Sequence, residues 1–202
     1  MINTIIFDFG NIFIDLNMPG LEKAFKDLGL TEWNEELDEL NKRFEIGKIS
    51  ETEFIQGFQK QLPDATVDEI RAAWNAILGV FPLERVEFLQ NLKGKYRLFL
   101  LTNTDMIHID HFEHKEGMSM TRDFYNCFEK VYYSYELGMR KPDVEIFKFL
   151  INKHELSPKR TLFVDDKKEN TDAAASLGLV VWNLKVGEEV VTDLFAKKII
   201  SL

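Results

Sequence analysis

Three short apolar segments of this chain run into polar residues, and this arrangement constrains the possible folds more than any other feature of the sequence. Segment 4–9 holds Asp8 and stops at Gly10-Asn11, segment 97–101 leads into Thr102-Asn103, and segment 161–164 leads into Asp165-Asp166. Short apolar, β-rich runs that stop at turn or polar residues indicate buried strands. Polar residues at several strand ends indicate a ligand site, because ligands of parallel α/β sheets bind beyond the carboxyl ends of the strands.

The rest of the chain extends this pattern on the C-terminal side. Segments 130–134 and 179–184 are strand-like, and helical signals lie at about 142–154 and 169–177. Strands that alternate with helices predict an α/β fold with a Rossmann-like, doubly wound parallel sheet. In such a sheet the polar strand ends would meet at one edge.

The segment 17–91 interrupts the alternation with helical spacing and without a convincing strand. Segments 50–53 and 66–69 have the form of capping boxes, in which a hydroxyl and a carboxylate satisfy exposed backbone donors at a helix start. Helix start and stop signals of this kind predict roughly four or five helices here. We therefore expect a helical insertion between the two parts of the core, 1–16 and 92–202.

The charge of the chain limits its partners. With 34 acidic and 25 basic residues, the formal net charge is −9 at pH 7. Proteins that bind the phosphate backbone of nucleic acids collect Lys and Arg on one face, so we expect no nucleic acid partner. An anionic substrate would need a locally positive site to compensate for the overall charge.

The sequence also gives expectations about location and assembly. Its apolar runs are too short or too interrupted to span a bilayer, and segment 1–8 lacks the basic flank and cleavage site of a signal peptide. We therefore expect a cytoplasmic protein without a membrane segment, and a monomer or a weak homo-oligomer.

The motifs at the strand ends resemble, in type and in order, those of the haloacid dehalogenase-like hydrolase superfamily. The segments that carry the resemblance are 5–12 with Asp8, 100–103 with Thr102, 138–142 with Lys141, and 162–166 with Asp165-Asp166. The resemblance implies a Rossmann-like catalytic core and identifies segment 17–91 as a small helical cap. Such a cap selects substrates and closes over the site, which excludes water.

The resemblance also implies roles for the acidic residues. In this family the first aspartate, here Asp8, attacks phosphorus and forms an aspartyl-phosphate, which divides one difficult displacement into two easier ones. The implied cofactor is Mg²⁺, a hard cation that prefers oxygen ligands, held by Asp8, the backbone carbonyl of Gly10, and Asp166. As a direct ligand of Mg²⁺, Asp165 is a weaker candidate than Asp166, because the family more often uses a carboxylate at that position to bind a metal-bound water.

Further polar residues are candidates for binding the phosphoryl group. Lys141 supplies a cation, Thr102 a hydroxyl donor, and Asn103 a backbone N–H, all suited to the charge on the phosphoryl oxygens. A solvated surface lysine is the alternative for Lys141. Asn170 follows the acidic pair and would orient Asp8 or a metal-bound water, although a helix-start asparagine explains it equally well.

Gly10 departs from the family pattern. Phosphatases of this family usually carry an aspartate there, which protonates the leaving alcohol and then activates water. Candidate substitutes are Asp15, which otherwise would cap the next helix, and His108, because histidine side chains often have a pKa suited to proton transfer. The Gly-Asn pair resembles a branch that includes α-D-glucose 1-phosphate phosphatases, and a hemiacetal leaving group needs less protonation than an alkoxide.

Two more segments contain candidate residues. The charged turn 43–48 and the pair Trp74-Asn75 would face the active site, with core packing as the alternative for Trp74 and solvent exposure for the charged residues of the turn. Segment 108–114 holds three histidines among acidic residues. We expect a polar, solvent-exposed connection there rather than a transition-metal site.

The predicted function is Mg²⁺-dependent hydrolysis of a small phosphorylated metabolite, namely a sugar phosphate. A 2-haloacid dehalogenase is the first competing function, because such relatives also lack the second aspartate and need no metal. The pair Asp165-Asp166 argues against it, since two carboxylates without a cation repel an anionic substrate. A catalytically weakened binding protein of the same fold, which Gly10 favours, is the second, and a phosphomutase that uses the same covalent intermediate is the third.

Overall fold

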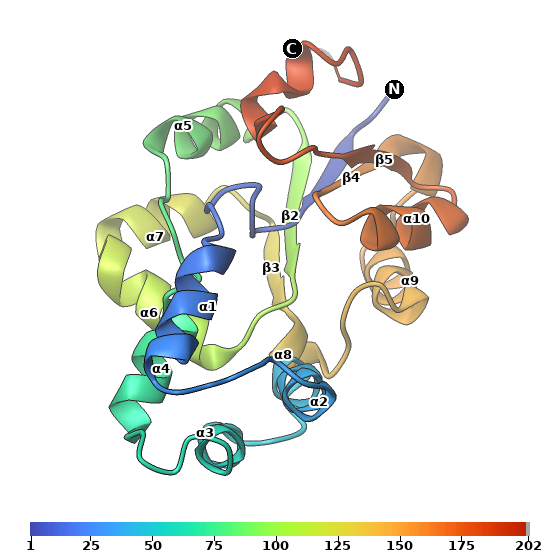
Figure 1. Ribbon diagram of the computed structural model, residues 1–202. Helices are drawn as coiled ribbons and strands as arrows, with labels where there is room; N and C mark the ends of the chain where they lie inside the picture. The colour runs from blue at the N-terminus through green and yellow to red at the C-terminus, as the bar shows by residue number, and fades with distance from the viewer. Residues whose placement is uncertain (201–202) are drawn as a thin grey trace.

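The computed structural model describes residues 1–200 and contains a five-stranded parallel sheet with the strand order β3-β2-β1-β4-β5 (Figure 1). The strands are β1 (Thr4–Phe7), β2 (Arg97–Thr102), β3 (Lys130–Tyr133), β4 (Thr161–Asp165) and β5 (Val180–Asn183). The chain winds outward from β1 first in one direction and then in the other. This topology confirms the predicted doubly wound sheet, and its switch point lies beside β1, where such folds bind ligands.

Helices cover both faces of the sheet (Figure 1). Successive side chains of a strand point to opposite faces, so Phe7 packs towards α5 (Leu83–Leu92) and α7 (Met118–Tyr125), whereas Ile6 packs towards α9 (Val144–Lys153) and α10 (Lys168–Ser176). The side chains of Ile6 and Phe7 are both fully buried. The strand before Asp8 is therefore fixed by packing on both sides.

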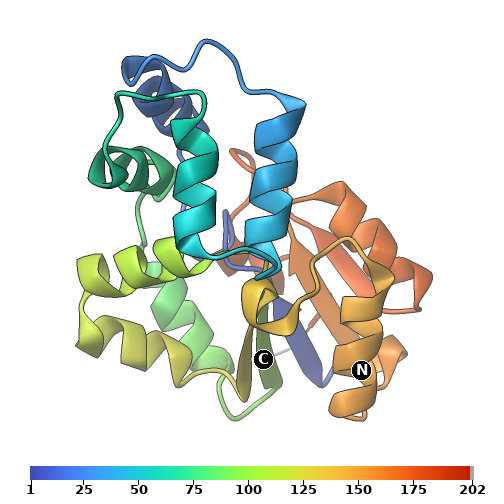
Figure 2. The same cartoon turned by 90° about the horizontal axis from the view of Figure 1, so that it is seen from below.

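The insertion after β1 consists of helices with a core of their own. Its elements are α1 (Met18–Asp27), α2 (Glu35–Glu45), α3 (Glu51–Gln59) and α4 (Val67–Asn75). Figure 2 shows them grouped to one side of the sheet, and their buried aromatic residues include Phe25, Phe54, Phe58 and Trp74. Both predicted capping boxes are present, at the starts of α3 and α4.

Helix α5 follows Pro82, as the sequence predicts, but it packs with the sheet and not with the insertion. Its Val86 and Leu89 belong to the hydrophobic cluster that covers β1. The two linkers of the insertion pair with each other before α5 begins, through an antiparallel bridge between Leu16 and Leu78. The boundary at 91 stays a prediction, and the packing of α5 supports a cap that ends near this bridge.

Segment 108–114 is not the exposed connection that we expected from its histidines. It lies within α6 (Met106–Glu116), whose N-cap is Asp105. Ile107, Ile109 and Phe112 are buried on this helix, and this burial together with the cap stabilises it. The expectation was wrong because it weighed the polar residues of the segment and not the apolar residues between them.

Three short elements complete the described chain: α8 (Ser134–Leu137) and the 3₁₀ turns η1 (Pro158–Arg160) and η2 (Val191–Phe195). None of the helices within residues 1–200 combines the length and the apolar character needed to cross a membrane.

Candidate active site

Asp8 follows β1 directly and lies at the carboxyl edge of the sheet. Its backbone N–H donates to the carbonyl of Val164 on β4 at 2.9 Å, which continues the sheet pairing by one residue. Its carboxylate Oδ1 is 2.8 Å from Nζ of Lys141. Burial raises the pKa of Asp8 to about 6, Lys141 opposes this shift, and the nearby carboxylates of Asp165 and Asp166 add to it.

Lys141 joins two carboxylates in the interior and is not a solvated surface lysine. Its side chain is 1% exposed, and Nζ donates to Oδ2 of Asp165 at 2.7 Å in addition to its contact with Asp8. Burial disfavours its charge, but the carboxylates of Asp165 and Asp8 outweigh this cost and raise the pKa of Lys141. The lysine is therefore a fixed cation beside Asp8.

The backbone around Lys141 is held by Asn103. The Asn103 amide Nδ2 donates to the carbonyl of Lys141 at 2.8 Å, and the Lys141 N–H donates to Asn103 Oδ1 at 2.9 Å. These two bonds join the loop after β2 to the loop before α9. The side chain of Asn103 thus positions the cation, a role that differs from the backbone donor predicted for it.

The adjacent residues Asp165 and Asp166 have different surroundings. Asp165 is fully buried, and its carboxylate accepts from Lys141, from Nδ2 of Asn170 at 3.0 Å, and from the N–H of Lys167 at 2.8 Å. Asp166 is partly exposed, and its Oδ2 accepts from Nδ2 of Asn11 at 2.8 Å. Asp165 therefore holds Lys141 in place, whereas Asp166 remains available towards solvent.

The loop after Asp8 explains why Gly10 and Asn11 occur there. Asn11 has a φ of 57°, a left-handed conformation that asparagine tolerates better than most residues, and its Oδ1 accepts from the N–H of Leu16 at 3.0 Å. A Cβ atom added to Gly10 would lie 2.9 Å from Cδ1 of Leu16. The Cβ atom of an aspartate at this position would thus contact the side chain of Leu16, in the linker that leads into the cap.

The donor set fits a hard divalent cation. Asp8, Asp165 and Asp166 each offer a carboxylate oxygen, and these oxygens lie within 4.8 Å of one another. Within residues 1–200, Lys141 is the basic residue that pairs with this cluster, and it contacts Asp8 and Asp165, so the three carboxylates keep an excess of negative charge. Carboxylate and carbonyl oxygens are the ligands that Mg²⁺ prefers. Since the bonds to Asp165 already occupy both of its oxygens, Asp8 and Asp166 are the better ligands of this set.

A cavity of about 920 Å³ opens above this cluster and reaches under the cap. The predicted site residues that line it are Asp8, Gly10, Thr102, Asn103, His108, Lys141, Asp166 and Asn170. Asp165 lies behind them. Asp15 lies instead in a separate cavity of about 320 Å³, where its carboxylate pairs with Arg85 at 2.7 Å. The structure therefore brings together the predicted residues with the exception of Asp15.

His108 connects the core to the cap. Its Nδ1 is 3.1 Å from the carboxylate of Asp105, its Nε2 is 3.1 Å from the carbonyl of Trp74 on α4, and its ring stacks on the indole at 4.9 Å. Burial opposes the imidazolium charge, but Asp105 raises the pKa of His108. Because both ring nitrogens have partners, proton transfer by His108 stays a prediction that this geometry does not favour.

The cap contributes polar residues that sequence reasoning did not single out. Glu22, Asn41 and Glu45 line the cavity from α1 and α2, and Oε2 of Glu45 pairs with Nε of Arg140 at 3.0 Å. Glu45 lies in the charged turn 43–48 that the sequence marks as facing the site, whereas the two basic residues of that turn are exposed. The charged residues of the turn thus indicated correctly that it lies near the site, but they did not show that Glu45 is the residue that lines the cavity.

The chain matches the haloacid dehalogenase-like hydrolase family over residues 2–178 and belongs to this family. It is 31% identical over 199 residues to the D-ribitol-5-phosphate phosphatase of Bacteroides thetaiotaomicron, with 94% of this chain and 95% of the relative covered. It is also 33% identical over 181 residues to the sesquiterpene phosphatase astK of Aspergillus oryzae, with 87% and 86% covered.

A solved structure of a family enzyme from Bacteroides thetaiotaomicron, crystallised in complex with magnesium and inorganic phosphate, superimposes with a TM-score of 0.83. The two chains are 32% identical, and the superposition covers 94% of this chain and 97% of that enzyme.

Proposed function

We propose that this protein is a Mg²⁺-dependent phosphate-monoester hydrolase that acts through an aspartyl-phosphate on Asp8, with a small sugar phosphate or polyol phosphate as substrate. One observation carries the proposal: Asp8 lies beside the buried cation of Lys141 and within reach of Asp166, at the base of the cavity. The similarity to phosphatases and to a family enzyme that binds magnesium and phosphate supports it.

In the first step a carboxylate oxygen of Asp8 attacks phosphorus, the P–O bond to the alcohol breaks, and the alkoxide leaves and takes up a proton. Asp8 is largely ionised at neutral pH, because its pKa is about 6. Lys141 and the hydroxyl of Thr102 stabilise the negative charge of the phosphoryl oxygens. Mg²⁺, held by Asp8, the carbonyl of Gly10 and Asp166, would supply further positive charge to the phosphoryl group when bound.

In the second step water attacks the phosphorus of the aspartyl-phosphate, the bond to the Asp8 oxygen breaks, and inorganic phosphate leaves. Gly10 has no side chain that transfers a proton, so the alcohol oxygen that leaves in the first step takes its proton from solvent. We therefore expect esters with good leaving groups, such as a sugar 1-phosphate, to react faster than esters of plain primary alcohols.

The test is phosphate release from D-ribitol 5-phosphate, α-D-glucose 1-phosphate and p-nitrophenyl phosphate, with and without Mg²⁺. We expect Mg²⁺-dependent release by the wild type and none by Asp8→Asn. The control Asp15→Asn should keep its activity, because Asp15 lies outside the cavity. Equal rates for the wild type and Asp8→Asn on every substrate would refute the proposal, and metal-independent chloride release from 2-chloropropionate would establish a dehalogenase instead.

A further inference from the structure

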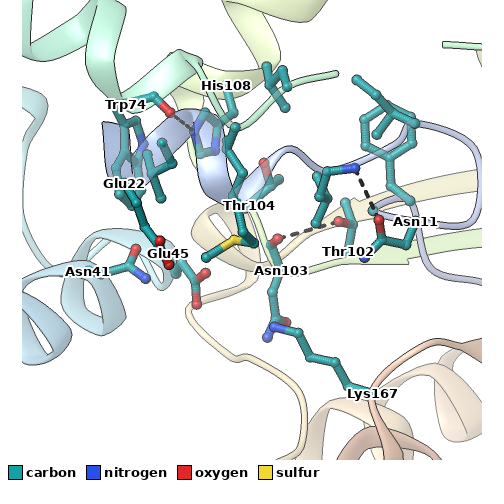
Figure 3. Close-up of a pocket in the computed structure, with 18 of the residues that line it drawn as sticks. Asn11, Glu22, Asn41, Glu45, Trp74, Thr102, Asn103, Thr104, His108 and Lys167 are labelled. Atoms are coloured by element: carbon teal, nitrogen blue, oxygen red, sulfur yellow. Dashed lines mark hydrogen bonds between the residues drawn. The ribbon is translucent and has the colours of Figure 1, made fainter. Parts of the chain in front are cut away.

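The cavity continues beyond the phosphate site into a chamber under the cap, and the wall of this chamber combines polar and aromatic side chains. Figure 3 shows Glu22, Asn41 and Glu45 on the cap side, with their polar ends turned towards one another, while Asn11 and Thr102 lie on the opposite side. Trp74 lies next to this polar group. These polar side chains face the place where the alcohol part of a phosphate ester bound at Asp8 would lie.

Asn41 is the residue of this wall that most directly indicates a ligand. Its side-chain oxygen Oδ1 is inaccessible to solvent and has no hydrogen-bond partner among the described residues. A buried amide oxygen without a partner costs free energy, so such atoms usually have an explanation, and a bound ligand is one. The missing partner must be a donor. Asn41 lines the cavity, but its oxygen is closed to a group of the size of water, so a substrate hydroxyl would meet it only after the amide turns towards the cavity.

Glu45 has a fixed position relative to the phosphate site. Arg140 holds its Oε2 at 3.0 Å, and Arg140 is the neighbour of Lys141 in the chain. Glu22 is exposed at the edge of the same wall. Ionised carboxylates accept hydrogen bonds and do not donate them. They therefore favour a ligand with hydroxyl groups. Arg140 compensates the charge of Glu45, but among the described residues the cap side of the cavity also carries Glu22, Glu32 and Asp38 against one lysine, Lys26, so it repels a ligand with a second negative charge.

The aromatic part of the wall suits the carbon skeleton of such a ligand. Trp74 is 4% exposed, and Trp33, which is 39% exposed, stacks on it with an interplanar angle of 11°. Both rings line the cavity. A purely hydrocarbon alcohol would bury apolar surface here, but it would offer no hydrogen-bond donor to the Asn41 oxygen, which has no partner among the described residues.

We propose that Glu22, Asn41 and Glu45 form a subsite that binds the hydroxyl groups of the alcohol part of the substrate and excludes alcohols that carry a second anionic group. The subsite rests on the proposed function, because that function places the phosphate at Asp8. It makes an uncharged polyol chain the alcohol part that binds most tightly, ahead of a carboxylated or a hydrocarbon one.

The test measures binding and does not depend on turnover. Isothermal titration of the Asp8→Asn chain with Mg²⁺ uses three probes: D-ribitol 5-phosphate, 3-phosphoglycerate and n-hexyl phosphate. We expect the polyol ester to bind most tightly. Adding Asn41→Leu should weaken its binding about 5- to 10-fold, as for one lost hydrogen bond, and leave n-hexyl phosphate unchanged or bound more tightly.

The charge of the wall is tested separately. Glu22→Gln should strengthen the binding of 3-phosphoglycerate relative to D-ribitol 5-phosphate, because a like charge is removed. The matched control Glu39→Gln changes the net charge equally on an exposed position of α2 outside the cavity, and it should leave this ratio unchanged.

Different outcomes distinguish the subsite from the proposed function. An equal change for all three probes with Asn41→Leu, an equal effect of Glu22→Gln and Glu39→Gln, or no binding of any ester would overturn the subsite. Selective binding of the polyol ester combined with the absence of phosphate release by the wild type would support the subsite and overturn the hydrolase.

Discussion

Replacing Lys141 by methionine removes the cation that lies between two buried carboxylates and keeps most of the volume of the side chain. Nζ is 2.8 Å from Asp8 and 2.7 Å from Asp165, and the side chain is 1% exposed. Nζ also lies 5.5 Å from the ring centre of Phe163. Methionine can pack against this ring, so the substitution mainly removes charge.

The expected loss is large because the carboxylates stay behind. Removing one partner of a buried ion pair costs about 3–5 kcal/mol. Asp165 keeps its bonds from Asn170 and from the backbone of Lys167, but Asp8 loses its cation and still faces the other carboxylates. We therefore expect the free energy of unfolding to fall by about 3–5 kcal/mol near neutral pH in the absence of Mg²⁺.

The loss should depend on pH in a defined direction. Lys141 lowers the pKa of Asp8, which is about 6 in the folded wild type, so its removal raises this pKa further above the unfolded value of 3.8. The folded variant then binds more protons than the unfolded chain. Its stability consequently increases as the pH falls through the raised pKa, and the deficit relative to the wild type shrinks.

Urea unfolding followed by circular dichroism in EDTA, at about pH 7.5 and about pH 5, measures both effects. The control is Lys148→Met, which removes an exposed pair with Glu145 whose side chains are 47% and 66% exposed. Such pairs contribute about 0–1 kcal/mol. If Lys141→Met lost no more stability than this control, or if its deficit grew on acidification, the bridging role of Lys141 would be wrong.

His108→Gln should lower the free energy of unfolding by about 1–3 kcal/mol at about pH 6, since a hydrogen bond to a charged group is lost. Because the folded pKa of His108 is raised, this difference should shrink as the pH rises through it, and a constant difference in urea unfolding would contradict this. Gly47→Ala should destabilise the chain more than Gly29→Ala in thermal unfolding: both have positive φ, but only at Gly47 would the new Cβ clash with a backbone atom, the carbonyl oxygen of Tyr135. Mg²⁺ at 100 times its Kd should stabilise the wild type by about 2.7 kcal/mol and Asp8→Asn by less, as chelation with EDTA would reveal.

Much of the site follows from the sequence because parallel strands end at one edge. Asp8 and Thr102 terminate neighbouring strands, so their proximity needs no further information than the strand pattern. The different roles of Asp165 and Asp166 did not follow from the pattern, since both are acidic and adjacent. Their roles depend on which carboxylate Lys141 and Asn170 reach, and this is a property of the packed loops.

The cap side of the site is less predictable for a physical reason. Glu22, Asn41 and Glu45 lie on two helices, and helical periodicity shows which face of each helix is apolar but not which polar residues face the core. That choice depends on how the cap docks. Docking is set by contacts between distant segments, such as Glu45 with Arg140 and His108 with Trp74, and the sequence pattern contains no signal for these pairs.

Gly10 lies between the catalytic residues and the linkers that join the cap to the core. The space beside it is occupied by Leu16, which lines the cavity and pairs with Leu78 in the linkers of the cap. An aspartate at this position would therefore shift the end of the Leu16 side chain in a linker of the cap as well as add an acid. The absence of the family aspartate thus leaves room for the Leu16 side chain as well as removing an acid, so a test of Gly10→Asp should be accompanied by Leu16→Ala, which makes that space.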